Sequence, residues 1–384
     1  MDAFRYTSYA QEIIFGPGSI YRLGQAIDRF PWRRLMLCST GTLRRNEAIA
    51  KMEKALGEHL VAIYEHVQPH VLDFQVAEAS LLAYENGVDA IIGFGGGSSI
   101  GMAKAVSLTL EGKRTKGPAR AAFPTDQPLV PVIAIPTTYA GSEMTPTCGI
   151  THHVDGSARK ITVTDAKITP KLALYDPLLT LKLSPRMTAS TGINALAHCI
   201  EALYSITRNP LSTATAISGI STITRALPRC YADGADVEAR TAMLKGAFLA
   251  GTAISQVAVA LHHGLCHVLG GTAGVPHGIA NGIILPHALR FNLEATAPQL
   301  AQAAEAMGIS LVHQSLESAV ETAIQNIYEM IRCMKLPQRL RDVGVHEEDI
   351  PHLAQVAMQS RAIHNNPKPI TNAAQIEEVL RTAW

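Results

Sequence analysis

Short apolar runs alternate with amphipathic segments over the first ~180 residues. A continuous apolar run is typical of a strand buried on both faces, and an apolar stripe with helical spacing is typical of a helix packed on a sheet. The predicted strands are 35–39, 61–66, 90–94 and 130–135, with a last strand pair within 161–175, and the predicted helices are 46–60, 74–86 and 100–110. This alternation predicts a parallel α/β domain.

The pattern changes after Pro185. Strand-like runs stop, and long segments rich in Ala, Leu and Ile take their place, which predicts a domain made only of helices. These segments are 186–205, 211–227, 236–257, 292–307, 315–334 and 346–360. A chain of 384 residues exceeds a typical single domain. We therefore predict two domains, 1–180 and 181–384.

Composition narrows the class of protein. Hydrophobic residues make up 47% of the chain and charged residues 17%, and the net charge of +1 comes without a long basic run. These values favour a globular protein and argue against nucleic acid as its partner. We find no apolar run of membrane-spanning length, no secretion signal and no paired-cysteine motif among the six cysteines. We expect a soluble cytoplasmic protein that acts on a small molecule.

The densest chemistry lies in the segment 261–277, LHHGLCHVLGGTAGVPH. His263 and His267 are four apart, so a helix would project both from one face. Gly270 and Gly271 are expected to end that helix, and Pro276 precedes His277. Neutral imidazoles bind metals such as iron and zinc, and they also act as acids and bases near neutral pH.

A second segment, 191–204, supplies partners for these histidines. Asn194 and His198 are four apart on a predicted helix face. We predict that Asn194, His198, His263 and His277 converge as four metal ligands, with His267 one turn away. The alternative is that the histidines are buried and hydrogen-bonded inside a helix packing. Their number and spacing favour a site.

The strand at 90–94 leads directly into a second informative segment, Gly95, Gly96, Gly97, Ser98 and Ser99. Glycines let a backbone approach a ligand closely, and the first turn of the following helix offers unpaired N–H groups. A pyrophosphate would fit there, although a tight turn is the alternative. After the next strand, Thr137, Thr138, Tyr139 and Ser142 lie in a hydroxyl-rich loop that could bind a ribose or a nicotinamide amide.

Together these segments resemble the iron-containing alcohol dehydrogenase family. The resemblance covers nearly the whole chain, through FGPGS at 15–19, GGGSSI at 95–100, IPTTYAGSE at 135–143, TGINALAHCIEALY at 191–204 and HHGLCHVLGG with PHGIANGIILPHALRFN up to 292. It implies a dinucleotide-binding N-terminal domain, a helical metal-binding C-terminal domain and hydride transfer in the cleft between them.

The resemblance also implies roles for single residues. Gly95 to Ser99 would hold the pyrophosphate, and Thr137, Thr138 and Ser142 would line the nicotinamide side. His198, His263 and His277 match metal ligands of the family, and His267 matches a histidine near the reacting carbon. The family implies a nicotinamide dinucleotide as cofactor, Fe²⁺ or Zn²⁺ as metal, and a homodimer.

Three departures from the family pattern point to one branch. Asn194 stands where the family has an aspartate ligand, and a neutral amide binds a divalent cation less well than a carboxylate. Gly101 replaces the aspartate of the phosphate loop, and Ser39 replaces the aspartate that faces the adenosine ribose. Without that carboxylate, Arg44 or Arg45 could receive a 2′-phosphate, so we expect NADH, NADPH or both. These features resemble the maleylacetate reductase branch.

We therefore expect an oxidoreductase that reduces maleylacetate to 3-oxoadipate. His263 would help to stabilise negative charge on the substrate, and His267 or His262 would supply the proton. Lys160, with Arg159 and Tyr139, is a candidate for binding a dicarboxylate or the cofactor. The first alternative is a metal-dependent alcohol dehydrogenase or aldehyde reductase, to which PHGIANGIILPH is similar. The distant alternative is a lyase on the related dehydroquinate-synthase-like scaffold.

Overall fold

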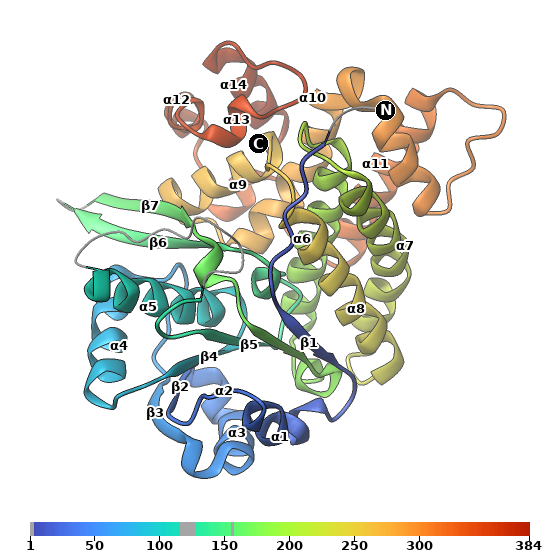
Figure 1. The fold of residues 1–384 in the computed structure, drawn as a ribbon. Coiled ribbons are helices and arrows are strands. Elements are labelled where there is room, and N and C mark those ends of the chain that lie inside the picture. Colours follow the sequence, from blue (N-terminus) through green and yellow to red (C-terminus); the bar gives the residue numbers. More distant parts are fainter. Residues whose placement is uncertain (1–3, 116–126, 155–156) are drawn as a thin grey trace. The chain divides into compact units, whose positions relative to one another are not determined.

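The structure is a computed structural model that describes residues 4–115, 127–154 and 157–384, without the side chains at 114–115, 153–154 and 157–160. The chain divides into two compact units, residues 7–183 and residues 184–384, and residues 4–6 group with the second. Figure 1 shows the elements of both units. Each unit is described by itself below.

A parallel sheet forms the centre of the first unit. Its strands, in spatial order, are β1 (Glu12–Phe15), β8 (Leu172–Tyr175), β5 (Val132–Pro136), β4 (Ala90–Gly95), β2 (Leu35–Cys38) and β3 (Leu60–Tyr64). Every neighbouring pair in this sheet is parallel. The predicted parallel α/β domain is therefore confirmed. The carboxyl ends of β4, β2 and β3 lie side by side, where a ligand of such a sheet usually binds.

Alternate residues of the strands enter two separate cores. Met36 and Ile91 point to one core, whereas Leu37 and Ile92 point to the other. Helices α4 (Asp73–Glu85) and α5 (Gly97–Thr115) cover the first face, and α1 (Leu23–Asp28) and α3 (Ala48–Leu56) cover the second (Figure 1). Because both faces are covered, the strands are apolar throughout, which explains why the sequence showed them as continuous runs.

Two predictions for this unit were wrong. The last strands do not pair with each other: β6 (Thr147–Val154) and β7 (Ser157–Thr164) form a separate antiparallel hairpin, and β8 lies between β1 and β5 in the main sheet. The polar, glycine- and proline-containing segment 111–127 predicts an exposed loop, but α5 continues to Thr115, and Glu111 is buried against Lys167 with 2.7 Å between Nζ and Oε1. Residues 116–126 of that segment lie outside the described part of the chain.

Helix boundaries in the first unit also differ from the prediction. The helix expected over 46–60 is shorter, because α3 spans 48–56 and a 3₁₀ turn follows at 57–59, and a short helix that was not predicted, α2 (Gly41–Arg45), precedes it. Helix α5 begins at Gly97 and not at Ile100, because Gly97, Ser98 and Ser99 form its first turn. The glycine segment is therefore partly helical.

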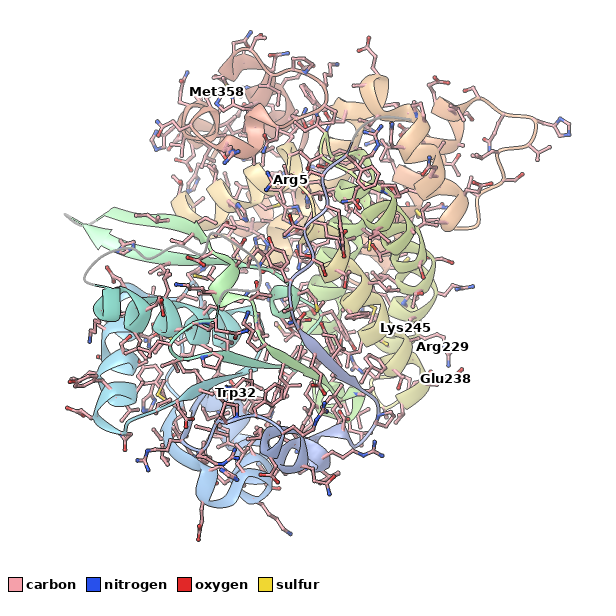
Figure 2. The ribbon with its side chains drawn as sticks, in the orientation of Figure 1. Arg5, Trp32, Arg229, Glu238, Lys245 and Met358 are labelled. Carbon is pink, nitrogen blue, oxygen red and sulfur yellow. The ribbon has the colours of Figure 1, made fainter. Side chains whose placement is uncertain are left out.

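The second unit consists of helices throughout, as predicted. They are α6 (Pro185–Tyr204), α7 (Pro210–Ala232), α8 (Val237–Ile254), α9 (Leu261–Thr272), α10 (His277–Ala306), α11 (Leu316–Cys333), α12 (Ile350–Met358), α13 (Arg361–His364) and α14 (Ala373–Thr382). Helix α6 is buried from Thr188 to Tyr204 and packs against α7, α8 and α10. Arg229 of α7 binds Glu238 of α8 at 2.9 Å at the surface (Figure 2).

Local chemistry fixes the ends of the helices that carry the histidines. Ser184 caps α6 through the backbone N–H of Met187, and Pro185 follows as the first helical residue. Helix α9 does not end at Gly270 and Gly271 but at Thr272, because Gly274, with φ of +66°, reverses the chain. Among the described residues, no helix has the length and apolarity needed to cross a bilayer.

Candidate active site

The glycine loop of the first unit is shaped by steric limits at its start. Gly95 has φ of +141°, and a Cβ atom there would lie 2.6 Å from the Oγ atom of Ser99. Gly95 and Ser99 are buried, whereas Gly96, Gly97 and Ser98 are partly exposed. The accessible backbone is thus the first turn of α5, where N–H groups have no partner within the helix and the helix dipole is positive. Such a turn can bind a pyrophosphate.

The loop after β5 packs directly on the glycine loop. The backbone N–H of Thr137 donates to the carbonyl of Gly95 at 2.9 Å, and a Cβ on Gly96 would lie 3.2 Å from Cγ2 of Thr138. Thr137 and Thr138 are almost fully buried, and Ser142 is partly exposed at the start of a short 3₁₀ helix. Tyr139 is fully buried.

Lys104, which the sequence analysis missed, holds this loop in place. Its buried Nζ donates to the carbonyls of Ser142 at 2.5 Å, Thr145 at 2.7 Å and Thr147 at 3.1 Å. Burial lowers the pKa of Lys104 to about 8. The glycine-loop helix and the hydroxyl-rich loop are therefore linked by one ammonium group.

Glu143 is buried in the same loop, and it too was missed. Burial raises the pKa of its carboxyl to about 7, although a hydrogen bond with Tyr175 and the Lys104 charge oppose the rise. A carboxyl group with this pKa is partly protonated near neutral pH. Only the tertiary fold buries Glu143, so no local pattern in the sequence distinguishes it from a surface glutamate.

Other predicted residues of the first unit lie as follows. Ser39 is fully buried at the end of β2, and its hydroxyl donates to the carbonyl of Phe94 at 3.0 Å. A Cβ at Gly101 would lie 2.9 Å from Cγ2 of Val71, so a side chain there would require Val71 to shift. The side chains of Arg159 and Lys160, on β7, lie outside the described residues.

The predicted histidines gather in the second unit. His198 and His263 stack with 4.8 Å between ring centroids, and the His263 ring lies 6.2 Å from that of His267 and 6.0 Å from that of His277. Asn194 lies one turn before His198 on α6 and is buried. His198 and His263 are buried, whereas His267 and His277 are partly exposed. The cluster therefore has an inner and an outer pair of histidines.

Glu201, a residue absent from the sequence prediction, orients His263. Its carboxylate accepts a short hydrogen bond from Nδ1 of His263 and another from the backbone N–H of Ala260 at 2.9 Å. Burial raises the pKa of Glu201, and its ionised carboxylate, which can only accept, places the proton on Nδ1 and leaves the lone pair on Nε2 of His263. Glu201 carries the one formal charge in the segment 191–204, three residues after His198, and that signal could have identified it.

His262 lies deeper than the other histidines. It is fully buried, its Nε2 lies 3.2 Å from the carbonyl of Asn281, and its Nδ1 lies 3.2 Å from Nδ1 of His263. The Sγ atom of Cys266 lies 3.7 Å from Nε2. All of these contacts are with buried groups of the second unit, so in this structure His262 packs against His263 and helps to hold it in place.

The inner histidines are neutral. Burial, followed by repulsion from neighbouring histidines, keeps the pKa values of His198 and His263 well below the usual range. Nδ1 of His198 and Nε2 of His263 are buried, and neither has a hydrogen-bond partner within the described residues. Buried nitrogens of this kind are expected to meet a ligand.

These residues fit a divalent cation. Neutral imidazoles are good ligands for Fe²⁺ or Zn²⁺, and a histidine ligand commonly donates its second nitrogen to a carboxylate, as His263 does to Glu201. A tighter group, Glu201, His262 and His263, has potential ligand atoms within 4.8 Å of one another. We interpret Glu201 as a residue that orients His263 and not as a metal ligand, because its carboxylate is hydrogen-bonded to Nδ1 of His263.

Comparison with known proteins identifies the relatives of this chain. The protein-family model named iron-containing alcohol dehydrogenase matches residues 10–177. A second family model, for the C-terminal part of the Fe-containing alcohol dehydrogenase family, matches residues 188–384. Maleylacetate reductase of Pseudomonas aeruginosa is 36% identical over 97% of this chain and 95% of its own. NAD-dependent methanol dehydrogenase of Bacillus methanolicus is 32% identical over 96% and 97%. The crystal structure of maleylacetate reductase from Rhizobium sp. strain MTP-10005 superimposes with a TM-score of 0.83 at 31% identity, covering 100% of this chain and 99% of that one.

Proposed function

The chain belongs to the iron-containing alcohol dehydrogenase family, and from this we propose that it is a maleylacetate reductase. The reaction would reduce the carbon–carbon double bond of maleylacetate with a reduced nicotinamide dinucleotide and give 3-oxoadipate. The observation that carries this proposal is Asn194, a neutral amide buried one turn before His198. A reductase that can work without a resident metal tolerates an amide at that position better than a metal-dependent dehydrogenase does.

We assign binding of the dinucleotide to the first unit. The accessible N–H groups at Gly97 and Ser98 would hold the pyrophosphate, because they lie at the positive end of α5. Thr137, Thr138 and Ser142 would face the nicotinamide side, in a loop that Lys104 fixes. When bound, the reduced nicotinamide supplies the hydride.

We assign handling of the substrate to the histidine cluster. Hydride addition leaves negative charge on a carbonyl oxygen of the substrate, and a proton must then reach the neighbouring carbon. His267 is the proposed proton donor, because it is partly exposed and lies beside His277, with 5.7 Å between the ring centroids. Neutral His263, with its lone pair at Nε2, would accept a proton or bind a cation.

A metal-dependent alcohol dehydrogenase or aldehyde reductase is the second candidate. It is favoured by the two buried histidine nitrogens, at His198 and His263, that lack a partner among the described residues. In that case His198, His263 and His277, with the amide of Asn194, would hold Fe²⁺ or Zn²⁺. A metal so held supplies Lewis acidity for a substrate oxygen.

The experiment that separates the two candidates combines metal analysis with cofactor oxidation. We would measure iron and zinc in the purified protein, and then NADH and NADPH oxidation with maleylacetate and with short aldehydes, before and after chelation. Turnover of maleylacetate that survives chelation supports the reductase. Activity on aldehydes that chelation abolishes and Fe²⁺ or Zn²⁺ restores would overturn it.

We further propose that the enzyme is a cytoplasmic homodimer. In support of the compartment, all six cysteines lie within the described residues and are free thiols, as is usual in a reducing cytosol. The proposal of a dimer is supported only by the resemblance to the family. Light scattering coupled to size-exclusion chromatography would test it, and a monomeric mass would contradict it.

A further inference from the structure

The carboxyl end of β2 is where a sheet of this kind usually meets the adenosine ribose of a dinucleotide. Strand β2 lies between β4, which leads into the glycine loop, and the edge strand β3 (Figure 1). The residue that follows β2 is Ser39, which is fully buried and donates its hydroxyl hydrogen to the carbonyl of Phe94. Ser39 therefore supplies neither a carboxylate nor a free donor to the ribose.

A carboxylate is present beside Ser39, but it comes from the neighbouring strand. Glu65 follows the last residue of β3, and the two strand ends are hydrogen-bonded: the N–H of Ser39 donates to Tyr64 at 2.9 Å, and the N–H of Val67 donates to Ser39 at 3.1 Å. A Cβ on Gly41, at the start of α2, would lie 3.9 Å from the carbonyl oxygen of Glu65. Glu65 thus stands at the same edge of the sheet as Ser39.

Arg44, a cation at this edge, is already paired. Nε of Arg44 lies 2.5 Å from Oε2 of Glu65, and Nη1 of Arg44 lies 2.8 Å from Oε1 of Glu53. Two carboxylates and one guanidinium give this trio a formal charge of −1. A 2′-phosphate would meet repulsion from both glutamates, and it would have to compete with them for Arg44.

We propose that Glu65 makes the enzyme select NADH over NADPH, by accepting a hydrogen bond from the 2′-hydroxyl of the adenosine ribose and by keeping Arg44 from a 2′-phosphate. This rests on the use of a nicotinamide dinucleotide. In other dinucleotide-binding sheets an acidic residue at the end of β2 accepts a hydrogen bond from the ribose 2′-hydroxyl. Here Glu65, at the end of β3, would accept that hydrogen bond. Arg45 is the competing residue, since its guanidinium contacts only Thr42, at 3.1 Å, among the described hydrogen bonds.

The test is a binding titration that needs no substrate. The Kd values of NADH and NADPH would be measured by fluorescence for the wild type, Glu65→Gln and Glu53→Gln. The wild type should bind NADH more tightly, and Glu65→Gln should lower the preference for NADH by about tenfold. Glu53→Gln is the matched control: it also removes a partner of Arg44 but leaves Glu65, so the preference should change by less than about threefold.

Several outcomes would overturn the proposal. They are a wild type that prefers NADPH, a Glu65→Gln variant with an unchanged preference, and an equal shift in both variants, which would assign the effect to Arg44 alone. Glu65→Asp, which keeps the charge, guards against a folding defect, because it should retain a preference for NADH. Since the titration involves no maleylacetate, an enzyme that binds NADH selectively but ignores maleylacetate would refute the proposed function and leave this inference standing.

Discussion

At the scale of single residues, the chemistry of the histidine cluster depends on one amide. Asn194 is buried beside His198 and supplies an oxygen without charge. Replacing it by aspartate should increase the affinity for Fe²⁺ or Zn²⁺ by at least about tenfold, because divalent cations prefer carboxylate oxygen. Metal analysis after equal loading of wild type and Asn194→Asp would measure the change.

The control for that experiment is Asn194→Ala, which keeps the position neutral and should remain as poor in metal as the wild type. Without metal, the new buried carboxylate should also lower the melting temperature, and adding metal should restore it. A wild type that already binds one metal per chain, with no gain from the aspartate, would contradict this prediction.

A second prediction concerns the carboxylate that orients His263. Glu201→Gln keeps the shape of the side chain, but an amide can also present a donor to Nδ1, so the tautomer of His263 is no longer fixed. We expect kcat to fall by about 10- to 100-fold, while the Kd of NADH stays the same. Glu111→Gln, which breaks a buried ion pair of the first unit with Lys167, is the control. Unchanged kcat in Glu201→Gln would show that the carboxylate does not serve the reaction.

At the scale of elements, the junction of β4 and α5 makes a steric prediction. Gly95→Ala places a Cβ 2.6 Å from Oγ of Ser99 at a positive φ, so we expect a loss of about 1–3 kcal/mol in the free energy of unfolding and weaker binding of NADH. For the stability part, Gly97→Ala is the matched control in the same loop, because its Cβ meets Ala140 at an ordinary 3.7 Å. Denaturant unfolding of both variants measures the difference, and equal losses would contradict the steric account.

The loop that Lys104 fixes carries a prediction about pH. Burial raises the pKa of Glu143 to about 7 from the usual 4.5 of a glutamate, so the folded chain holds this proton at pH values where the unfolded chain has released it. The contribution of Glu143 to the free energy of unfolding is fully present below about pH 4.5 and is lost as pH rises through about 7.

Glu143→Gln tests this linkage, because glutamine does not titrate. The difference in unfolding free energy between wild type and variant should shift in favour of the variant from about pH 5 to 8. The fluorescence of Trp32 would report the first unit, in a Trp384→Phe background that removes the second of the two tryptophans. A difference that does not vary with pH would contradict the raised pKa.

The elements also show which features can be predicted from sequence. Strands β2, β3, β4 and β5 and the longer helices of the second unit were predictable, because burial imposes continuous apolar runs on the strands and a helical period on the helices. Strand β1 and helices α13 and α14 were not predicted. Pairing is set by tertiary contacts, so the hairpin of β6 and β7 was mistaken for part of a strand pair. Gly270 and Gly271 were expected to end α9, but a helix tolerates glycine, and the positive φ of Gly274 ends it.

Spacing was sufficient to find the histidines, since residues four apart on a helix share a face whatever the fold. It was insufficient for Lys104 and Glu143, whose partners come from the backbone of another segment or from Tyr175. It was also insufficient for Glu65, which gains its place beside Ser39 only when β3 pairs with β2. Polar residues whose role depends on a partner distant in sequence leave no periodic signal.

At the scale of the whole molecule, the two units are predicted to respond to different ligands. The dinucleotide is assigned to residues 7–183 and the cation to the histidines of residues 184–384. Each unit contains one tryptophan, Trp32 in the first and Trp384 in the second, so their unfolding can be followed separately in single-tryptophan variants. A ligand stabilises the unit that binds it, by about 2.7 kcal/mol at a concentration of 100 times its Kd.

We expect NAD⁺ at that concentration to raise the midpoint of the thermal transition seen at Trp32 by about 5–10 °C, and to raise the one at Trp384 less. Zn²⁺ added to the Asn194→Asp variant should raise the midpoint seen at Trp384 more than the midpoint seen at Trp32. Gly95→Ala should reduce the effect of NAD⁺ and keep that of Zn²⁺, because it alters only the glycine loop. If each ligand shifted both tryptophans equally, the two units would unfold as one, and the assignment of each ligand to its own unit would lose its support.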